Sequence, residues 1–495
     1  MPSVTTNDLR ILNTENLVED LSDLANTGLA YVAIGRPVEW ESGDQTPPIP
    51  SNNKDEFNEL FDEMMALKKI ENGTSYPLIS RYEWVSGSFY DIYRHDYSET
   101  NTSRTGASNL ASARYVVINQ NNDVYVCLNN KGGQPSTAEP QNEGDTPFYT
   151  SDGYQWLRVY QITTANLEQS TAALIPVITA AENDPITTTD GAVYTALIDN
   201  PGANYTSSPA GATNQINDYY CRITGDGTGA VAKVTVTNGQ ISDITIVRFG
   251  SGYTYAHIDF RANFVYKSLE DLDNRTNALN PLGDGTFAST VIIGPSGGWG
   301  TDLVRELSAT KCGVFMPLDF NETDFLTGTT FRQVAILKGV EAIPTLTNPV
   351  TMDATFAVRV TTVNAEAPIY TPGELISQSV TVDGQTKTAW GIVAQWGGDD
   401  EVNGILSYVQ DPRVKTDDDG GIYEFTGTSP IIGQTTGKIG IADNFDGDES
   451  NRTFENGYSR PEVVKYTGEL IHLSNTTPVL RSSSQTEKLS IIISY

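Results

Sequence analysis

The spacing of apolar residues predicts two helices and a strand near the N-terminus. Between residues 14 and 26 the apolar positions share one helical face and a glycine follows shortly after, which predicts a short amphipathic helix. The run LAYVAIG, 29–35, predicts a strand. Asn53 is placed to cap a second helix, whose apolar stripe extends from Phe57 to Leu67 and has to be buried against another part of the protein.

From residue 76 onward the pattern is mainly that of β-strands. Apolar residues alternate with polar ones, or run together over strand lengths, between turns rich in Gly, Asn, Ser and Pro. Asn121-Asn122-Asp123 is expected to form a hairpin turn, 131–151 a surface loop and 302–309 one further short helix. The strand-like segments are 76–84, 88–96, 113–130, 154–162, 289–294, 331–337, 354–363, 389–396, 421–425, 465–473 and 488–495.

A short sequence motif occurs twice in the centre of the chain. The pattern G-x-x-Y-T occurs at 202–206 and again at 250–254, on either side of the cleanly alternating stretch 230–247. Within that stretch, Asn238-Gly239 is typical of a type I′ hairpin turn. These features predict one inserted all-β module at about 190–262, in which the glycines adopt positive φ and the tyrosines pack across the module.

The predicted fold class is therefore α+β and mainly β: several antiparallel sheets or sandwiches, a few short helices and the inserted module. We expect an N-terminal α+β scaffold at 1–165, a central β region at 166–330 that includes the insert, and a C-terminal β scaffold at 331–495.

Composition excludes several classes of partner. The 495 residues include 62 Asp and Glu against 31 Lys and Arg, a net charge of −31, so neither nucleic acid nor an anionic membrane is an expected partner. No apolar stretch is long enough to span a bilayer, and the acidic N-terminal segment does not have the pattern of a secretion signal. Cys127, Cys221 and Cys312 are too few and too far apart for a disulfide framework, and are expected to be free, buried thiols.

One motif suggests catalysis. Gly294-Pro295-Ser296-Gly297-Gly298 is a literal G-x-S-x-G between a predicted strand and a predicted helix, which is the context of a hydrolase nucleophile. However, Pro295 precedes the would-be nucleophile, the repeated βα alternation of that fold is missing, and His472 is the only downstream histidine. We therefore expect Ser296 to be a turn residue and the protein not to be an enzyme.

Other candidate sites also have simpler interpretations. The glycine-rich segment 225–229 is followed by a strand rather than a helix, which favours a hairpin turn over a phosphate loop. The acidic segment 443–448, around Asp446, could hold a structural cation or be a solvated loop. His95, His257 and His472 are isolated from each other and from the cysteines. No catalytic, cofactor-binding or metal-binding residue is assigned, and no cofactor is expected.

Several sequence blocks keep a common order from one end of the chain to the other. They are YVAIGRPVEW (31–40), PPIP (47–50), Met64-Met65, ISRYEW (79–84), VYVCLNN (124–130), DGYQWLRVYQI (152–162), FRQVAIL (331–337) and the C-terminal segment 468–495. In these blocks the chain resembles gene product eight of T4-like bacteriophages, the baseplate wedge protein of the contractile tail. The region from about 165 to 330 departs from that pattern and makes this chain longer.

The resemblance implies a structural, non-catalytic late protein of a T4-like myovirus. It implies a homodimer that docks to the equivalents of T4 gene products six, seven and ten, is made in the bacterial cytoplasm and ends in the virion as a baseplate wedge subunit. An alternative is a glycan- or receptor-binding tail appendage, expected to be a trimer, which would use exposed aromatics such as Tyr205 and Tyr253. A third hypothesis is a hydrolase that uses Ser296.

Overall fold

The computed structural model confirms the predicted fold class. It describes residues 6–51, 53–94, 96–144, 146–178, 188–206, 217–319, 326–347, 349–362, 370–397 and 403–495. Strands account for 41% of the chain and helices for 11%, with several antiparallel sheets and a closed barrel. Within the described part, no helix is long and apolar enough to cross a membrane.

The chain folds into two compact units that each combine segments distant in sequence. Unit 1 consists of Met1–Val18, Tyr76–Gly313 and Ile492–Tyr495, and unit 2 of Glu19–Ser75 and Val314–Ile491. The sequence pattern predicts domain boundaries near residues 165 and 330, so that each domain is one continuous segment. The units follow a different partition because their sheets pair strands from both halves of the sequence.

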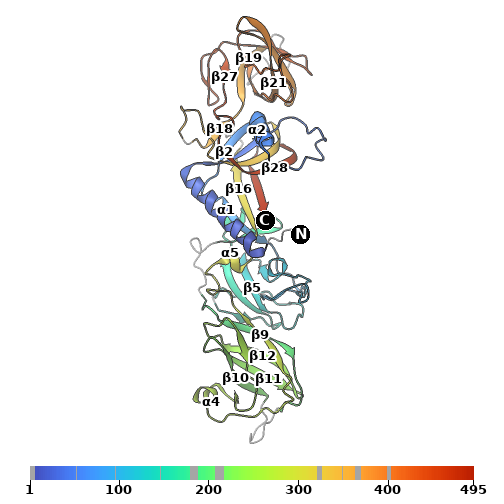
Figure 1. Ribbon diagram of the computed structural model, residues 1–495, viewed down its shortest axis with the longest axis vertical. Helices are drawn as coiled ribbons and strands as arrows, with labels where there is room; N and C mark the ends of the chain where they lie inside the picture. Colours follow the sequence, from blue (N-terminus) through green and yellow to red (C-terminus); the bar gives the residue numbers. More distant parts are fainter. Residues whose placement is uncertain are drawn as a thin grey trace. The chain divides into compact units, whose positions relative to one another are not determined.

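A five-stranded antiparallel sheet forms the centre of unit 2 (Figure 1). Its strand order is β18-β2-β1-β17-β28, and helix α2 leads directly into β2. The buried faces of these strands and of α2 form one hydrophobic core. The elements are β1 (Ala30–Gly35), α2 (Lys54–Glu63), β2 (Met64–Lys69), β17 (Thr330–Lys338), β18 (Thr351–Asp353) and β28 (Glu469–Leu480).

The second predicted helix is correct at its start and wrong at its end. Asn53 caps α2 as predicted, since its side chain accepts a hydrogen bond from the Glu56 amide at 2.8 Å. The helix stops at Glu63, and the apolar residues from Met64 to Leu67 form β2, between β1 and β18. Four consecutive buried apolar residues suit a central strand that is covered on both faces better than they suit one stripe of a helix.

The other large sheet of unit 2 closes into a barrel. Its order is β22-β21-β20-β23-β24-β19-β27, and β22 also pairs with β19, which joins the two sides. The predicted strand at 421–425 is wrong: this segment is irregular, and its Phe425 instead fills the barrel core. The strands are β19 (Phe356–Thr362), β20 (Leu375–Val382), β21 (Gln385–Gly397), β22 (Asn403–Val409), β23 (Ile431–Gly433), β24 (Ile439–Ala442) and β27 (Tyr458–Ser459), with the hairpin β25 (Gly447–Glu449) and β26 (Arg452–Phe454) beside them.

The chain also contains a smaller sheet and a long N-terminal helix. A four-stranded sheet has the order β29-β16-β3-β8, formed by β3 (Ser75–Ser80), β8 (Leu174–Pro176), β16 (Lys311–Leu318) and β29 (Glu487–Ser494). Helix α1 (Asn7–Thr27) includes the predicted helix at 14–26 and begins earlier, so the short apolar stretch before residue 14 belongs to its first turns.

One sheet of unit 1 contains the predicted hairpin. Strands β4 and β5 pair across Asn122, whose φ of 63° suits a tight turn, and β7 follows beside β5. The predicted strand at 88–96 is wrong, because Tyr90 and Ile92 are buried against Trp156 without a ladder of their own. The elements are η1 (Leu110–Ser112), β4 (Val116–Ile118), β5 (Asp123–Asn129), β6 (Phe148–Tyr149), β7 (Gln155–Gln161) and α3 (Thr164–Leu167).

The inserted module is all-β at its core and longer than the sequence suggested (Figure 1). The turn at Asn238-Gly239 has φ values of 53° and 80°, which confirms the predicted type I′ hairpin between β11 and β12. Strand β15 pairs with β9, so the module's core continues past residue 262. The elements are β9 (Val193–Asn200), β10 (Asp218–Gly225), β11 (Val231–Thr237), β12 (Gln240–Arg248), β13 (Ala256–Ile258), β14 (Val265–Tyr266), α4 (Leu269–Asn274) and β15 (Ala288–Ile293). The short helix α5 (Leu303–Glu306) follows β15 in the chain.

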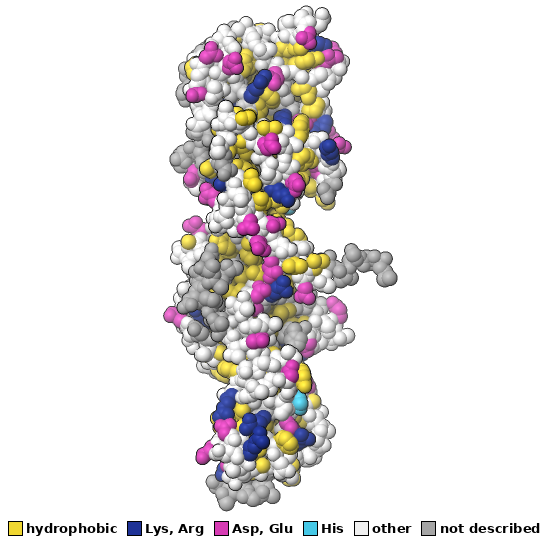
Figure 2. Space-filling view, turned by 60° about the vertical axis from the view of Figure 1, so that its left-hand side comes forward, with side chains coloured by type: hydrophobic (Ala, Val, Ile, Leu, Met, Phe, Trp, Pro, Cys, Tyr) yellow, Lys and Arg dark blue, Asp and Glu magenta, His cyan; other side chains and the backbone are white. Residues whose placement is uncertain are grey.

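Basic side chains gather on the visible face over the region of β10 to β12 (Figures 1 and 2). Two basic residues of β11 and β12 have acidic partners: Arg248 forms an ion pair with Asp273 at 2.6 Å, and Lys233 lies 3.8 Å from Asp218. These two charges are therefore neutralised within the module.

Candidate functional site

Ser296 lies exposed in a glycine turn after β15. Gly297 and Gly298 have φ values of 84° and 85°, and the Gly297 amide donates a hydrogen bond to Asp190 at 2.8 Å. A Cβ on Gly298 would lie 2.4 Å from the Thr188 carbonyl oxygen. In the described part of the chain, no hydrogen bond joins Ser296 to a histidine or a carboxylate. The G-x-S-x-G sequence thus closes a tight turn against residues 188–190.

The glycine-rich segment 225–229 is a turn that holds the second G-x-x-Y-T motif. Asp226 accepts hydrogen bonds from the Thr254 amide at 2.9 Å, the Thr254 hydroxyl at 2.5 Å and the Tyr255 amide at 3.2 Å. The pKa of Asp226 is lowered to about 2, mainly by the hydrogen bond from the Thr254 hydroxyl. Asp226 therefore ties the turn to the motif.

Both motif tyrosines are buried, as the packing interpretation predicted. Tyr205 is 5% exposed, and Tyr253 is 3% exposed with its hydroxyl donating to the Ile223 carbonyl at 3.0 Å. The motif glycines Gly202 and Gly250 have φ values of 60° and 64°. The alternative hypothesis required these tyrosines to be exposed platforms for a glycan, and that expectation is wrong because they fill the module's core.

The acidic segment 443–448 has internal partners for its carboxylates. Asp443 forms an ion pair with Arg359, Asp446 accepts from the Asn456 amide at 2.6 Å, and Asp448 accepts from the Thr453 hydroxyl at 2.8 Å. Among the described residues, no group of three or more His, Cys, Asp or Glu side chains is arranged to hold a metal ion.

Among the residues that the structure describes, the histidines and cysteines do not form a site. His257 exchanges a hydrogen bond with the Thr224 hydroxyl at 2.9 Å, and burial lowers the pKa of His472. His95 lies outside the described residues. The three cysteines are free and buried, as predicted.

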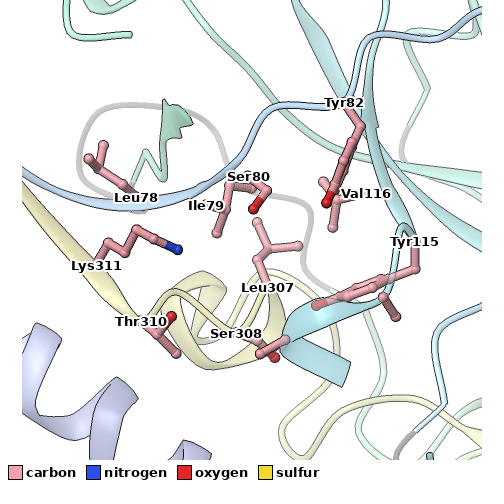
Figure 3. Close-up of a pocket in the computed structure, with 12 residues that line it drawn as sticks. Leu78, Ile79, Ser80, Tyr82, Tyr115, Val116, Leu307, Ser308, Thr310 and Lys311 are labelled. Atoms are coloured by element: carbon pink, nitrogen blue, oxygen red, sulfur yellow. The ribbon is translucent and has the colours of Figure 1, made fainter. Parts of the chain in front are cut away.

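A small pocket in unit 1 brings a lysine close to several hydroxyl groups (Figure 3). Lys311 extends between the 78–80 segment of β3 and the Leu307-Ser308 turn, with Ser80 and Tyr115 on the lining. The Tyr115 hydroxyl is already engaged, donating to the Glu306 carbonyl at 2.9 Å. The cavity volume of about 30 Å³ suits a water molecule, whereas substrate pockets occupy roughly 300 Å³ or more.

The most unusual chemical arrangement is a buried ionic network in unit 2 that sequence reasoning missed. Arg36 follows β1 and has a φ of 61°, which turns its side chain toward the end of α2. Its guanidinium lies 4.0 Å from the ring centroid of Trp40 and 2.7 Å from a carboxyl oxygen of Glu63. Glu59 also contacts Arg36, at 3.3 Å.

The network continues from α2 to two distant segments. Arg413 pairs with Asp411 at 2.8 Å and with Asp62 at 3.5 Å. Asp62 also accepts a hydrogen bond from the Tyr466 hydroxyl at 2.5 Å and forms an ion pair with the Lys465 amine at 3.5 Å. Four carboxyl groups, those of Glu59, Asp62, Glu63 and Asp411, thus face three cations, those of Arg36, Arg413 and Lys465.

The network favours the protonated form of Glu63. Burial raises the pKa of Glu63 to about 8, Arg36 opposes the shift, and the neighbouring Asp411 carboxylate adds to it. A protonated Glu63 can donate a hydrogen bond to Asp411, which removes the repulsion between the two carboxyl groups. We infer that the network stabilises the packing of α2 against the segments at 411–413 and 465–466.

We expect stability to depend on the proton of Glu63. The folded state keeps this proton up to about pH 8, whereas the unfolded chain releases it near its ordinary value of 4.5. The free energy of unfolding should therefore fall as the pH rises from 4.5 to 8, by at most about 1.4 kcal/mol per pH unit. Urea unfolding of Glu63→Gln at pH 5 to 9 should show a flatter profile, because glutamine mimics the neutral acid.

Glu59→Gln is the matched control, since Glu59 belongs to the same network but its side chain is 34% exposed. It should retain the wild-type slope. Equal slopes for wild type and Glu63→Gln would show that Glu63 is ionised in the folded protein.

A comparison with protein-family models and with curated proteins found no match to this chain. Of the features that the sequence singled out, the structure places the turn glycines and motif tyrosines in structural roles.

Proposed function

We propose that this protein is a structural subunit of a contractile-tail baseplate wedge. In this proposal it acts as a homodimer and docks to neighbouring wedge proteins during tail assembly in the bacterial cytoplasm. Its role is to present rigid β-surfaces at fixed positions, and it needs neither catalysis nor a cofactor.

The observation that carries the proposal is the convergence of the resemblance blocks in unit 2. The blocks at 31–40 and 64–65 lie far along the chain from those at 331–337 and 468–480, yet together they supply β1, β2, β17 and β28 of one sheet. Each strand pairs antiparallel with the next from β2 through β1 and β17 to β28. Blocks that matched by chance would have no reason to build one framework together.

Contacts outside the strands join the same blocks. The Trp40 indole donates a hydrogen bond to the Thr476 carbonyl at 3.0 Å, and the Asn475 amide donates to the Pro48 carbonyl at 3.0 Å. The proline-containing segment at 47–50 is thereby fixed against the C-terminal block. These contacts support a scaffold in which the blocks depend on each other.

The remaining blocks form a second framework in unit 1. The strands β5 and β7, from 124–130 and 152–162, pair along their length. The ISRYEW block joins them through Trp84, whose amide donates to the Ile118 carbonyl at 2.9 Å. The departing region, by contrast, contributes the inserted module with its separate core.

The β28 strand supports the self-association part of the proposal. It ends the sheet order and pairs with β17 on one side, so it is an edge strand among the described elements. It is 12 residues long, and Val479 and Leu480 at its end are 40% and 67% exposed. Long edge strands with apolar side chains are common sites of strand addition between chains.

The location of the protein in the virion tests the proposal. Antibodies raised against the purified chain, and visualised with gold on tails of the virus that encodes it, should label the baseplate. Antibodies absorbed with purified protein are the control and should leave the tails unlabelled. Label confined to fibres, or intact tails that stay unlabelled while disrupted tails do not contain the protein, would contradict the proposal.

A further inference from the structure

An open groove in unit 1 combines exposed apolar groups with arginines. Its volume is about 400 Å³, and its lining includes the charged residues Arg81, Glu83 and Arg114 beside Tyr82, Val85 and Phe89. Val85 is 55% exposed and Phe89 is 40% exposed. The base is rigid, since the Tyr90 hydroxyl accepts the Val85 amide at 2.7 Å and Tyr90 itself is buried. Two large apolar side chains held open to solvent in this way suit the binding of another chain.

Arg114 lines the groove and lies over an aromatic ring, and Arg104 lies over the ring of Phe89, which also lines it. The guanidinium carbon of Arg114 is 5.2 Å from the ring centroid of Tyr82, and that of Arg104 is 4.9 Å from the ring centroid of Phe89. Among the described residues, neither arginine has an acidic side chain within ion-pair distance, whereas Arg81 is paired with Glu83 at 2.7 Å. A guanidinium stacked on a ring keeps its N–H edge available for a carboxylate.

A single buried carboxylate positions both arginine-bearing segments. Asp91 is fully buried, and it accepts hydrogen bonds from the Thr105 amide at 3.0 Å and the Thr105 hydroxyl at 2.6 Å. It also accepts the backbone amide of Arg114 at 2.8 Å. Arg104 directly precedes Thr105, so the two segments are fixed to the same anchor. Such preorganisation reduces the entropy lost on binding.

The acidic composition of the chain bears on which groups can pair with Arg104 and Arg114. In a protein with 62 acidic and 31 basic residues, a basic side chain has many possible acidic partners within its own chain. Among the described residues, Arg104 and Arg114 stack on rings without an acidic partner, so both guanidinium groups can pair with carboxylates of another chain. The overall charge of −31 repels a long polyanion such as nucleic acid, but it opposes a short segment with a few carboxylates much less.

We propose that this groove binds an extended acidic segment of a partner protein. Carboxylates of the segment would pair with Arg104 and Arg114, while an apolar side chain between them would pack on Phe89 and Val85. The inference rests on the proposed function and deepens it, because it gives the chemistry of one docking partner. It also gives a role to Tyr82 of the ISRYEW block, which lines the groove.

Fluorescence anisotropy of a labelled peptide against the full-length protein tests the proposal. The probe is Glu-Glu-Leu-Leu-Glu-Glu, and the same peptide with glutamine in place of glutamate is the ligand control. At near-physiological salt, the double variant R104Q/R114Q should weaken binding of the glutamate peptide at least about tenfold, as expected for the loss of two charge-assisted pairs. Phe89→Ser should weaken it as well, by removing the apolar contact.

The matched protein control is R261Q/R460Q, which removes the same two charges at exposed positions, where Arg261 pairs with Asp259 and Arg460 with Glu424. It should change the affinity less than about twofold, because exposed charges are screened at this salt concentration. Equal weakening by both double variants, equal binding of both peptides, or no binding of the glutamate peptide would overturn the proposal. Tighter binding of oligothymidylate than of the peptide would instead indicate a nucleic-acid site.

These results separate the groove from the wider function. If the peptide fails to bind while antibodies label the baseplate, the groove assignment alone is wrong. If the peptide binds as expected and the antibodies label another part of the virion, the groove is a docking site and the wedge assignment is wrong.

Discussion

Gly283→Ala is expected to destabilise the inserted module by about 3 kcal/mol or more, whereas Gly285→Ala two residues away should cost about 1 kcal/mol. Both glycines have positive φ, 98° and 74°, so the backbone penalty is similar. They differ in their surroundings: a Cβ on Gly283 would lie 2.1 Å from the Tyr205 ring, while a Cβ on Gly285 would meet nothing within 4 Å.

The Tyr205 ring cannot move away from such a methyl group. On its other edge a Cβ at Gly202 would lie only 2.5 Å away, and Phe260 packs against the ring at a centroid distance of 5.4 Å. The ring is therefore confined between two glycines inside the core. The difference between the two variants isolates this confinement from the general cost of alanine at positive φ.

Hydrogen exchange of peptides from β9 to β15, combined with urea unfolding, measures the effect where it arises. A Tyr205→Val background should remove most of the difference between Gly283→Ala and Gly285→Ala, because the ring that causes it is gone. Equal destabilisation by the two alanine variants in the wild-type background would show that Tyr205 does not pack as described.

Arg452→Met is expected to cost about 3 to 5 kcal/mol of stability in unit 2. Arg452 is 8% exposed and forms an ion pair with Asp353, which is 4% exposed. Its guanidinium also donates to the Thr355 carbonyl at 3.1 Å and the Thr355 hydroxyl at 2.7 Å. Removing the arginine leaves the Asp353 carboxylate buried without its cation, which is the main source of the cost.

Arg460→Met provides the matched control, because Arg460 and its partner Glu424 have side chains 78% and 52% exposed. That variant should lose less than about 1 kcal/mol. Urea unfolding of both variants gives the comparison, and the double variant R452M/D353A should recover part of the loss. A buried pair that costs no more than the exposed one would contradict the assignment of Arg452 as a structural cation.

Local features of the fold were predictable where a short segment determines them. The Asn53 cap depends on a side chain and an amide three residues away, and the Asn238-Gly239 turn depends on two residues that tolerate positive φ. The buried glycine and tyrosine motif was predictable for the same reason. Each of these signals is complete within a few neighbouring residues.

Features that depend on distant partners were not predictable. Met64 to Leu67 form a strand because β1 and β18 lie on either side, which the segment itself does not reveal. Closure of the barrel requires β22 to pair with β19, across a long stretch of sequence. Phe425 looked like part of a strand because its apolar character, which serves the barrel core, resembles strand patterning.

The ionic network illustrates the same limit for the candidate site. Arg36, Glu63 and Asp411 come from three separate segments, and none stands out among 62 acidic and 31 basic residues. The one usable signal was Arg36 itself, a charged residue directly after a fully buried strand. The groove arginines were equally hidden, because their role depends on Asp91 and on the rings beneath them.

The oligomeric state of the full-length chain tests the central proposal most directly. Light scattering of the purified protein should give twice the chain mass of 53.8 kDa, as a homodimeric wedge subunit requires. Deletion of the inserted module should leave the dimer intact if the framework sheets carry the self-association. A trimer of the full-length chain would contradict the wedge proposal and favour a tail appendage, and a monomer at high concentration would contradict the homodimer.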